Sequence, residues 1–176
     1  MDTKTKILDL AEQLTQTRGF NGFSYLDLAD EIGIKSASIH YHFKAKDDLA
    51  VALVQRIHDT HRNSFQSMEV EIKSSAKRLE AVVEYFQRYV VDQKFCMCGM
   101  MAAELQSVSP RVSTLLDAYF NDFQDWLARQ FKDMGHKNAK MQALSFLSAL
   151  EGSLLLARLR NDPKTVADAL KRFLKP

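Results

Sequence analysis

Residues 35–46 read KSASIHYHFKAK and concentrate groups that bind phosphates or the edges of bases. The stretch holds three lysines, two histidines, two serines and a tyrosine, and it contains no acidic residue. Lysine ammonium groups neutralise phosphates and release counterions, and small or polar side chains at the start of a helix reach base edges in the major groove. These residue types favour contact with nucleic acid. An exposed polar helix in an ordinary helical bundle is the alternative.

Two further constellations carry chemistry. Cys96 and Cys98 stand at the start of an expected helix, where a thiol becomes more acidic, so Cys96 is a candidate sensor of electrophiles or oxidants. Buried, inert thiols are the other interpretation. His58 and His61 lie three residues apart, but two ligands do not make a zinc site, and no metal or cofactor is expected. A cysteine nucleophile needs a histidine base and a third orienting group, and no motif supplies them, so an enzyme is not expected.

Composition limits the class of protein. With 176 residues, of which 46% are hydrophobic, the chain can bury a sizeable core. Its polar start, MDTKTKILDL, does not resemble a signal peptide, and no run reaches the roughly 18–20 apolar residues of a membrane span. We therefore expect a cytoplasmic protein with no membrane partner. The two closely spaced cysteines fit a reducing compartment, and the net charge of +2 does not by itself indicate a polyanion partner.

The elements that must position these groups are helices. Three prolines and six glycines interrupt the chain, and apolar residues recur at spacings of three and four, which predicts an all-α protein. A first helix should end near Gly19, and Ser24 should cap a second that Gly33 ends. Ser36 should cap a short third helix whose Ile39 and Phe43 face the core. Two short helices joined by a glycine-containing turn make a helix-turn-helix, which lays its second helix in the DNA major groove.

The stretch FSYLDLADEIGIKSASIHYHFKAKDDL, residues 23–49, resembles the DNA-binding domain of the TetR family of one-component transcriptional repressors. His40 stands where this family usually has tyrosine, and Ala45 stands where serine often caps the fourth helix, so Asp47 and Asp48 are left to favour that helix start. The resemblance implies a helix-turn-helix domain over residues 1–46 and an effector-binding and dimerisation domain over 47–176. The helix pattern and the resemblance together imply a set of DNA-contacting residues: Ser24, Lys35, Ser36, Ala37, Ser38, His40, Tyr41, His42 and Lys46.

The larger domain should contain a long fourth helix from Lys46, an amphipathic fifth, a sixth over CMCGMMAAEL, and a seventh from Pro110 to Gly135. The resemblance implies an effector cavity among the fourth to eighth helices, and plain core packing is the alternative at each lining position. The candidates for an effector or sensor site are His58, Phe86, Tyr89, Cys96, Met97, Met100, Met101, Phe123 and Trp126, whose apolar and aromatic character indicates an apolar or aromatic effector.

The segment MQALSFLSALEGSLLLARL is apolar on nearly every side, so it needs two burial partners. In the resembled family the last two long helices pair with their copies in a second subunit, and a homodimer would read a pseudo-palindromic DNA operator. Burial within one subunit is the alternative. Glu151 within this segment should have a hydrogen-bonded partner or an edge position. The residues expected at the dimer interface are Leu147, Leu150, Gly152, Leu154, Val166, Leu170 and Phe173.

The predicted function is a DNA-binding repressor released by a small-molecule effector. A cysteine-based sensor of the same fold is the first alternative. A helical interaction module without DNA binding is a second, and it would be favoured if Lys35, Tyr41 and Lys46 were buried or paired with acids.

Overall fold

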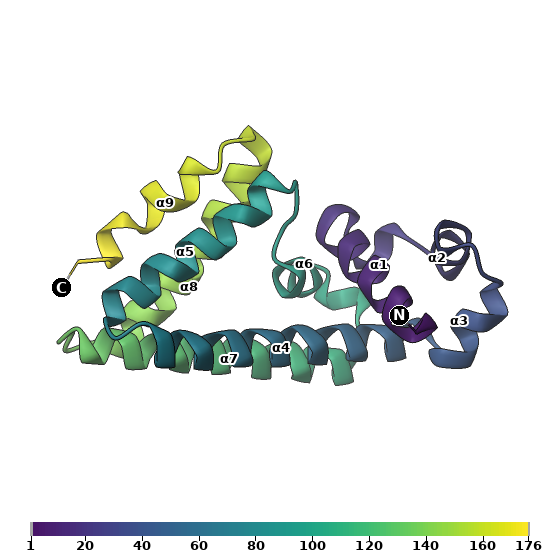
Figure 1. Cartoon of the computed structure of the whole chain (residues 1–176), viewed down its shortest axis with the longest axis horizontal. Coiled ribbons are helices and arrows are strands. Elements are labelled where there is room, and N and C mark those ends of the chain that lie inside the picture. Colours follow the sequence, from purple (N-terminus) through teal and green to yellow (C-terminus); the bar gives the residue numbers. More distant parts are fainter. Residues whose placement is uncertain (1, 176) are drawn as a thin grey trace. The chain divides into compact units, whose positions relative to one another are not determined.

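The structure is a computed structural model that describes residues 2–175. Within that range the chain forms helices and no strands, so the all-α prediction is confirmed (Figure 1). None of these helices is long and apolar enough to cross a lipid bilayer. The α-helices are α1 (Thr3–Arg18), α2 (Tyr25–Ile32), α3 (Ser36–His42), α4 (Lys46–Glu71), α5 (Ser75–Val91), α6 (Met97–Ala103), α7 (Pro110–Asp133), α8 (Ala139–Arg160) and α9 (Lys164–Leu170).

The start and end of α2 follow from local chemistry. Ser24 is the N-cap: its hydroxyl accepts a hydrogen bond from the backbone N–H of Asp27, and the Asp27 carboxylate accepts one from the backbone N–H of Ser24. Gly33 ends the helix in the left-handed region at φ 76°, where a Cβ would be strained. This capping box was expected from the sequence. It fixes where the turn before α3 begins.

The start of α3 differs from the sequence-based prediction. Lys35, and not Ser36, occupies the N-cap position, and no side chain caps the helix. The register is nevertheless as expected, since Ile39 and Phe43 are buried with exposed fractions of 0% and 3%. These two side chains anchor α3, so the remaining side chains of the helix lie along its outer surface.

The chain divides into two compact units. Unit 1 groups the residues through Asp59 with Met97–Ala118, and unit 2 groups Thr60–Cys96 with the residues from Tyr119 onward. Helices α4 and α7 therefore supply residues to both units, and α6 belongs to unit 1. This spatial grouping differs from the division at residue 46 drawn from the sequence, which stays a prediction about domains.

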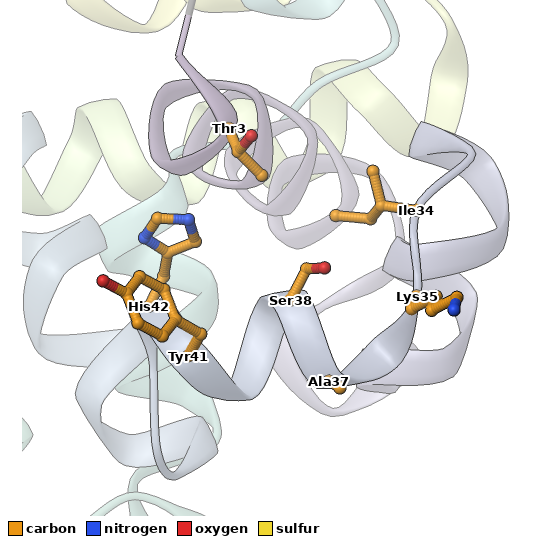
Figure 2. Close-up of a pocket in the computed structure, with 7 residues that line it drawn as sticks. All are labelled: Thr3, Ile34, Lys35, Ala37, Ser38, Tyr41 and His42. Atoms are coloured by element: carbon orange, nitrogen blue, oxygen red, sulfur yellow. The ribbon is translucent and has the colours of Figure 1, made fainter.

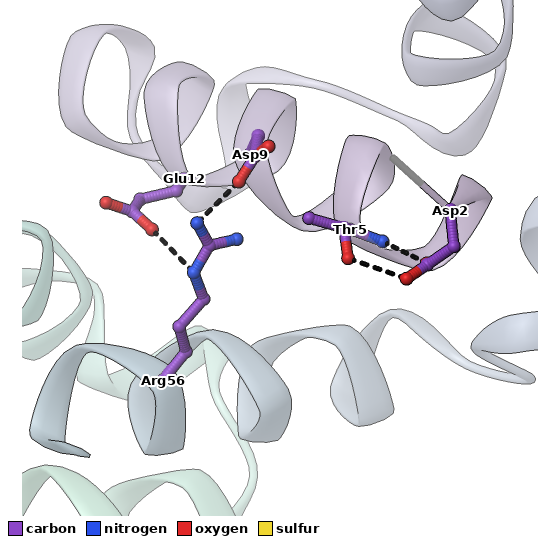
Figure 3. Close-up of polar contacts among 5 residues, drawn as sticks. All are labelled: Asp2, Thr5, Asp9, Glu12 and Arg56. Atoms are coloured by element: carbon purple, nitrogen blue, oxygen red, sulfur yellow. Dashed lines mark hydrogen bonds and ion pairs between the residues drawn. The ribbon is translucent and has the colours of Figure 1, made fainter. Parts of the chain in front are cut away.

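In unit 1, α1 packs against α2, α3 and α6. Its first turn is capped by the carboxylate of Asp2, which accepts hydrogen bonds from the backbone N–H and the hydroxyl of Thr5 (Figure 3). Arg56 of α4 forms ion pairs with Asp9 and Glu12 of α1. These contacts join the first helix of the unit to the first half of α4.

In unit 2, α8 and α9 pack against each other and both pack against α5. The buried face of α5 contains the apolar residues expected from its periodicity, among them Leu79, Val83, Phe86 and Val90. Phe131, Phe146 and Phe173 meet edge to face in the same core, with ring centroids 5.5–6.2 Å apart.

Helix α8 has one buried face and one exposed face, and three of the residues predicted for the dimer interface, Leu147, Leu150 and Leu154, lie on the buried one. Apart from Gly152, which is exposed, all the residues predicted for this interface have exposed fractions of 0–6% within a single chain. They are Leu147, Leu150, Leu154, Val166, Leu170 and Phe173. They belong to the core of their own chain, so their assignment to a dimer interface stays a prediction that this burial does not favour. The exposed apolar face of α8 is a different set: Met141, Leu144, Leu155, Leu156 and Leu159.

Candidate nucleic-acid interface

The outer surface of α3 is exposed and polar. Tyr41 has an exposed fraction of 83%, Lys35, Ala37 and His40 are also exposed, and Ser38 is half-buried. Because the buried side of the helix is occupied by Ile39 and Phe43, these side chains share the outer side. Short polar and aromatic groups on the outer side of the second helix of a helix-turn-helix are the arrangement that reads base edges.

A hollow of about 380 Å³ lies beside this surface (Figure 2). Figure 2 shows the side chain of Thr3, from α1, opposite α3 across the hollow. The surface thus includes a residue of α1 that the sequence analysis did not name. The lining residues are Thr3, Ile34, Lys35, Ala37, Ser38, Tyr41 and His42.

Three other residues predicted to contact DNA, Ser24, Ser36 and His42, differ in how exposed their side chains are. Ser36 and His42 are half-buried on α3, and the His42 ring packs edge to face on Tyr41 with centroids 5.1 Å apart. Ser24 is exposed, but its hydroxyl already donates to the Asp27 carboxylate at 2.7 Å as part of the cap of α2. A DNA contact by Ser24 stays a prediction, and it would have to coexist with the cap.

His40 and Tyr25 hold α2, α3 and the start of α4 together. The His40 ring packs edge to face on Tyr25, with centroids 4.9 Å apart. The Tyr25 hydroxyl donates to the carbonyl of Ala45 at 2.7 Å. Burial, and next the charge of Asp48, raise the pKa of Tyr25 to about 12, so the hydroxyl keeps its proton and remains a donor. The Asp48 carboxylate also accepts from the backbone N–H of Ala45 at 3.1 Å, which ties the residue before α4 to the first turn of that helix.

Lys46 is half-buried, and its ammonium group is held within unit 1. It donates to the carbonyl of Phe23 and lies 4.6 Å from the ring centroid of Phe23 and 4.9 Å from that of Phe20. Burial lowers the pKa of Lys46, and the charges of Glu104 and Asp27 oppose that change. Lys46 thus fastens the start of α4 to the segment before α2. Its role as a phosphate contact stays a prediction.

The candidate effector residues fall into both units: His58, Met97, Met100 and Met101 in unit 1, and Phe86, Tyr89, Cys96, Phe123 and Trp126 in unit 2. Met97 and Met101 are buried, and His58 and Met100 are half-buried. Phe86, Phe123 and Trp126 have exposed fractions of 1–3%. Phe86 and Phe123 stack with centroids 6.0 Å apart.

A buried histidine organises the aromatic residues of unit 2, and the sequence analysis gave it no such role. His61 is 3% exposed. Its Nδ1 hydrogen-bonds with the Tyr119 hydroxyl at 2.9 Å and its Nε2 with the Tyr85 hydroxyl at 3.3 Å. The Tyr85 hydroxyl in turn lies 2.9 Å from that of Tyr89. The i,i+4 spacing of Tyr85 and Tyr89 is visible in the sequence, but their convergence on His61 depends on tertiary packing.

The metal and thiol hypotheses can be compared with this geometry. Among residues 2–175, no three His, Cys, Asp or Glu side chains gather as a metal site would require. Cys96 and Cys98 are not joined in a disulfide, and they are buried with exposed fractions of 2% and 0%. The Cys96 thiol hydrogen-bonds with the Glu151 carboxyl group. Burial and an adjacent acidic group both disfavour the thiolate that electrophile sensing needs, so the cysteine sensor is the weaker alternative.

A short helix with a polar outer surface, presented by a capped helix and a glycine turn, defines a DNA-binding protein of the helix-turn-helix class. Comparison with known proteins identifies the family. Residues 7–53 match the model of bacterial regulatory proteins of the tetR family. Residues 75–172 match the LmrA/YxaF-like C-terminal domain of transcriptional regulators. The chain therefore belongs to the TetR family of transcriptional regulators, as the sequence motif indicated, and this is a family of regulators and not of enzymes.

Solved structures agree over the whole chain. A TetR transcriptional regulator from Legionella pneumophila is 31% identical, with a TM-score of 0.93 over 99% of this chain and 96% of that one. A TetR-family regulator from Agrobacterium tumefaciens is 28% identical, with a TM-score of 0.92 over 97% and 95% of the two chains. A curated relative, a helix-turn-helix regulator in the lacX 3′ region of Lactococcus lactis subsp. lactis, is 23% identical over 168 residues, which are 92% of this chain and 86% of that protein.

Proposed function

We propose that this regulator is a homodimeric repressor that binds a pseudo-palindromic DNA operator through α3 and leaves it when a small apolar or aromatic effector binds. The observation that carries the proposal is the outer surface of α3, with Tyr41 83% exposed. The interaction-module alternative would be favoured if Lys35, Tyr41 and Lys46 were buried or paired with acids. Lys35 and Tyr41 are exposed, whereas Lys46 is half-buried and donates to the carbonyl of Phe23. Family membership supports operator binding.

The exposed face of α8 supports the dimer. Met141, Leu155 and Leu159 are 60–80% exposed, and Leu144 and Leu156 are 45% and 41% exposed. Leucines at these spacings form an apolar stripe along the helix, and such a stripe is stable in water when another apolar surface covers it. The sequence between them supplies Gly152, where an added Cβ would meet nothing within 4 Å in its own chain. A second copy of α8 is the covering surface we propose.

A link between effector and DNA binding requires an element that responds to both. Helix α4 contributes Lys46–Asp59 to unit 1 and Thr60–Glu71 to unit 2. Within unit 1 it is tied to α1 by Arg56, which pairs with Asp9 and Glu12 (Figure 3). An effector that binds better to a conformer with wrongly spaced recognition helices would shift the population away from the DNA-bound state. A differential affinity of about 3 kcal/mol changes the ratio of the two conformers by roughly two orders of magnitude.

The experiment that tests the proposal is selection of bound duplexes from a random DNA pool at two salt concentrations. A palindrome with half-sites about one helical turn apart is the expected product. Affinity should fall with added salt, because phosphate contacts release counterions. Failure to enrich any sequence, both without ligand and across a broad ligand screen, would favour the interaction module. The selected duplex then serves as the probe for effectors.

A further inference from the structure

Helix α8 contains one acidic side chain in an otherwise uncharged stretch. Glu151 is the only charged residue between Lys140 and Arg158. It is half-buried, and the residues one helical turn away on the inner side, Leu147 and Leu154, are 6% and 0% exposed. Glu151 therefore lies where the buried face of α8 meets the exposed one.

The carboxyl group of Glu151 points inward, although part of the residue is accessible. It has a side-chain hydrogen bond with the Cys96 thiol. Its Oε1 atom is buried and has no hydrogen-bond partner within the described chain. Burial raises the pKa of Glu151 to about 7, and the thiol hydrogen bond opposes that rise. Both Cys96 and Glu151 belong to unit 2, so this pair is a feature of one compact unit.

A carboxylate buried with one oxygen unsatisfied is costly to a fold, and such groups occur where a function needs them. The missing interaction is specific in two respects. The oxygen needs an N–H or O–H donor, and the ionised carboxylate needs a positive charge. A donor that also carries the charge forms a charge-assisted hydrogen bond, which is roughly twice as strong as a neutral one. A protonated amine or an amidinium meets both needs in one group.

We propose that Glu151 anchors the cationic N–H group of the effector, so that the effector is a primary or secondary ammonium, or an amidinium, on an apolar body. The inference rests on the proposed function as an effector-responsive regulator and narrows the chemical class of the effector. The Cys96 thiol holds one carboxylate oxygen and leaves Oε1 for the ligand. The apolar body follows from the proposed function, in which the effector is apolar or aromatic. The rival occupant of this oxygen is a donor from a second copy of the chain.

Matched pairs of ligands test the charge requirement. The probes are 4-phenylbutylamine with its neutral counterpart 4-phenylbutanol, and benzamidine with benzamide, measured by titration calorimetry on the full-length protein. The variants are Glu151→Gln, which keeps the shape and removes the charge, and Glu84→Gln, a control at an exposed acid on α5. For the wild type we expect at least one cation to bind ten-fold or more tightly than its neutral partner. Glu151→Gln should abolish that preference, and Glu84→Gln should retain it.

The outcomes separate this inference from the function it rests on. The inference would be overturned if cation and neutral partner bound equally well, or if neither cation bound. It would also be overturned if Glu151→Gln kept the wild-type preference for the cation. The inference would also fail if Glu151→Gln changed only the monomer–dimer equilibrium measured by sedimentation. Glu151 would then bind a donor from the second copy of the chain and not a ligand. If a neutral compound releases the selected duplex and no cation does, the repressor function stands and this inference fails. If a cation binds through Glu151 without affecting DNA, the site stands and effector-controlled repression fails.

Discussion

Helices α3 and α8 each bury one face and expose the other, but their exposed faces have opposite chemistry. Helix α3 exposes Lys35, His40 and Tyr41, and α8 exposes methionine and leucines, with Leu159 80% exposed. A polar face meets a charged, hydrated surface such as DNA at little cost, because its groups exchange water for phosphates and base edges. An apolar face gains only from a dry partner. The exposure of a helix face therefore does not identify its partner, whereas the polar or apolar character of the exposed side chains does.

The two units also differ in how completely they satisfy their own polar groups. In unit 1, Asn21 donates to the Glu104 carboxylate at 2.8 Å and Lys46 donates to the carbonyl of Phe23. The buried side-chain atoms left without a partner, among residues 2–175, are Trp126 Nε1, His136 Nε2 and Glu151 Oε1, and all belong to unit 2. Unsatisfied buried groups are retained where function requires them, so this difference favours unit 2 as the ligand-responsive part.

The largest effect should come from breaking the apolar face of α8. Leu155→Asp removes an apolar contact from both copies and introduces a charge, so dimerisation should weaken by roughly 4 kcal/mol, nearly a thousandfold. Sedimentation at several concentrations measures it. Val70→Asp is the control, since Val70 is an apolar residue that is 84% exposed on a different helix, α4. A Leu155→Asp protein that remains dimeric would remove α8 as the interface.

Glu151 should make the stability of unit 2 depend on pH. Its pKa is raised from 4.5 to about 7, so between these values the folded protein binds more protons than the unfolded one. The free energy of unfolding should therefore fall as pH rises through this window, and level off above it. At 1.36 kcal/mol per pH unit the loss is roughly 3 kcal/mol.

Chemical denaturation of the wild type and Glu151→Gln from pH 4.5 to 8 measures this loss. The wild type should lose stability relative to the variant as pH rises, because glutamine does not titrate. Parallel pH profiles of the two proteins would show that the Glu151 carboxyl has the same pKa in the folded and the unfolded protein, and would contradict the raised value.

The sequence predicted the helices closely and the burial of α8 only in part. Ser24, Gly33 and Pro110 mark ends of helices through local chemistry, which needs no tertiary information. Helix α8 is apolar on nearly all sides, so the spacing of its apolar residues does not show which side faces the core. For this reason Leu147 and Leu150, which are buried in the core, were assigned to the dimer interface.

The parts of the candidate sites that the sequence did not reveal all depend on contacts between distant segments. His61 meets Tyr119 across 58 residues and Lys46 meets the carbonyl of Phe23 across 23. No spacing rule connects such pairs. The proposed DNA-contacting surface of α3 was predictable because its residues are consecutive on one short helix, whereas Thr3 lines the hollow beside it from a different helix.

Lys46→Ala tests whether unit 1 is held together by the residue expected to bind phosphate. The variant loses a charged hydrogen bond to the carbonyl of Phe23 and two ring contacts, so unit 1 should lose about 2 kcal/mol of stability. Thermal unfolding measures this loss, and DNA titration across salt concentrations measures the phosphate contact. If Lys46 binds phosphate, affinity should fall for all sequences and the salt slope should decrease by about one contact. Unchanged stability would contradict the packing role.

Tyr41→Ala and Ser38→Ala each remove a side chain from the outer surface of α3 that is proposed to contact base edges. Both side chains line the hollow beside α3 and neither anchors the helix, so stability should change little. Affinity for the selected operator should fall by about 1–2 kcal/mol and the preferred sequence should change, because a lost base contact relaxes discrimination at its position. Repeating the selection with each variant measures both. A uniform loss across all sequences would make these residues phosphate contacts instead.

The smallest expected effect is at Thr3, and it decides whether α1 belongs to the polar surface. Thr3→Val keeps the shape and removes a hydroxyl that lines the hollow opposite α3 (Figure 2). If that hydroxyl bonds to DNA, affinity should fall by about 1 kcal/mol, the usual contribution of one neutral hydrogen bond. The control is Thr17→Val at the far end of α1, where the hydroxyl donates to the carbonyl of Gln13 at 2.9 Å. Equal affinities for Thr3→Val and wild type would restrict the interface to α3, whereas a loss at Thr3 alone would extend it to α1.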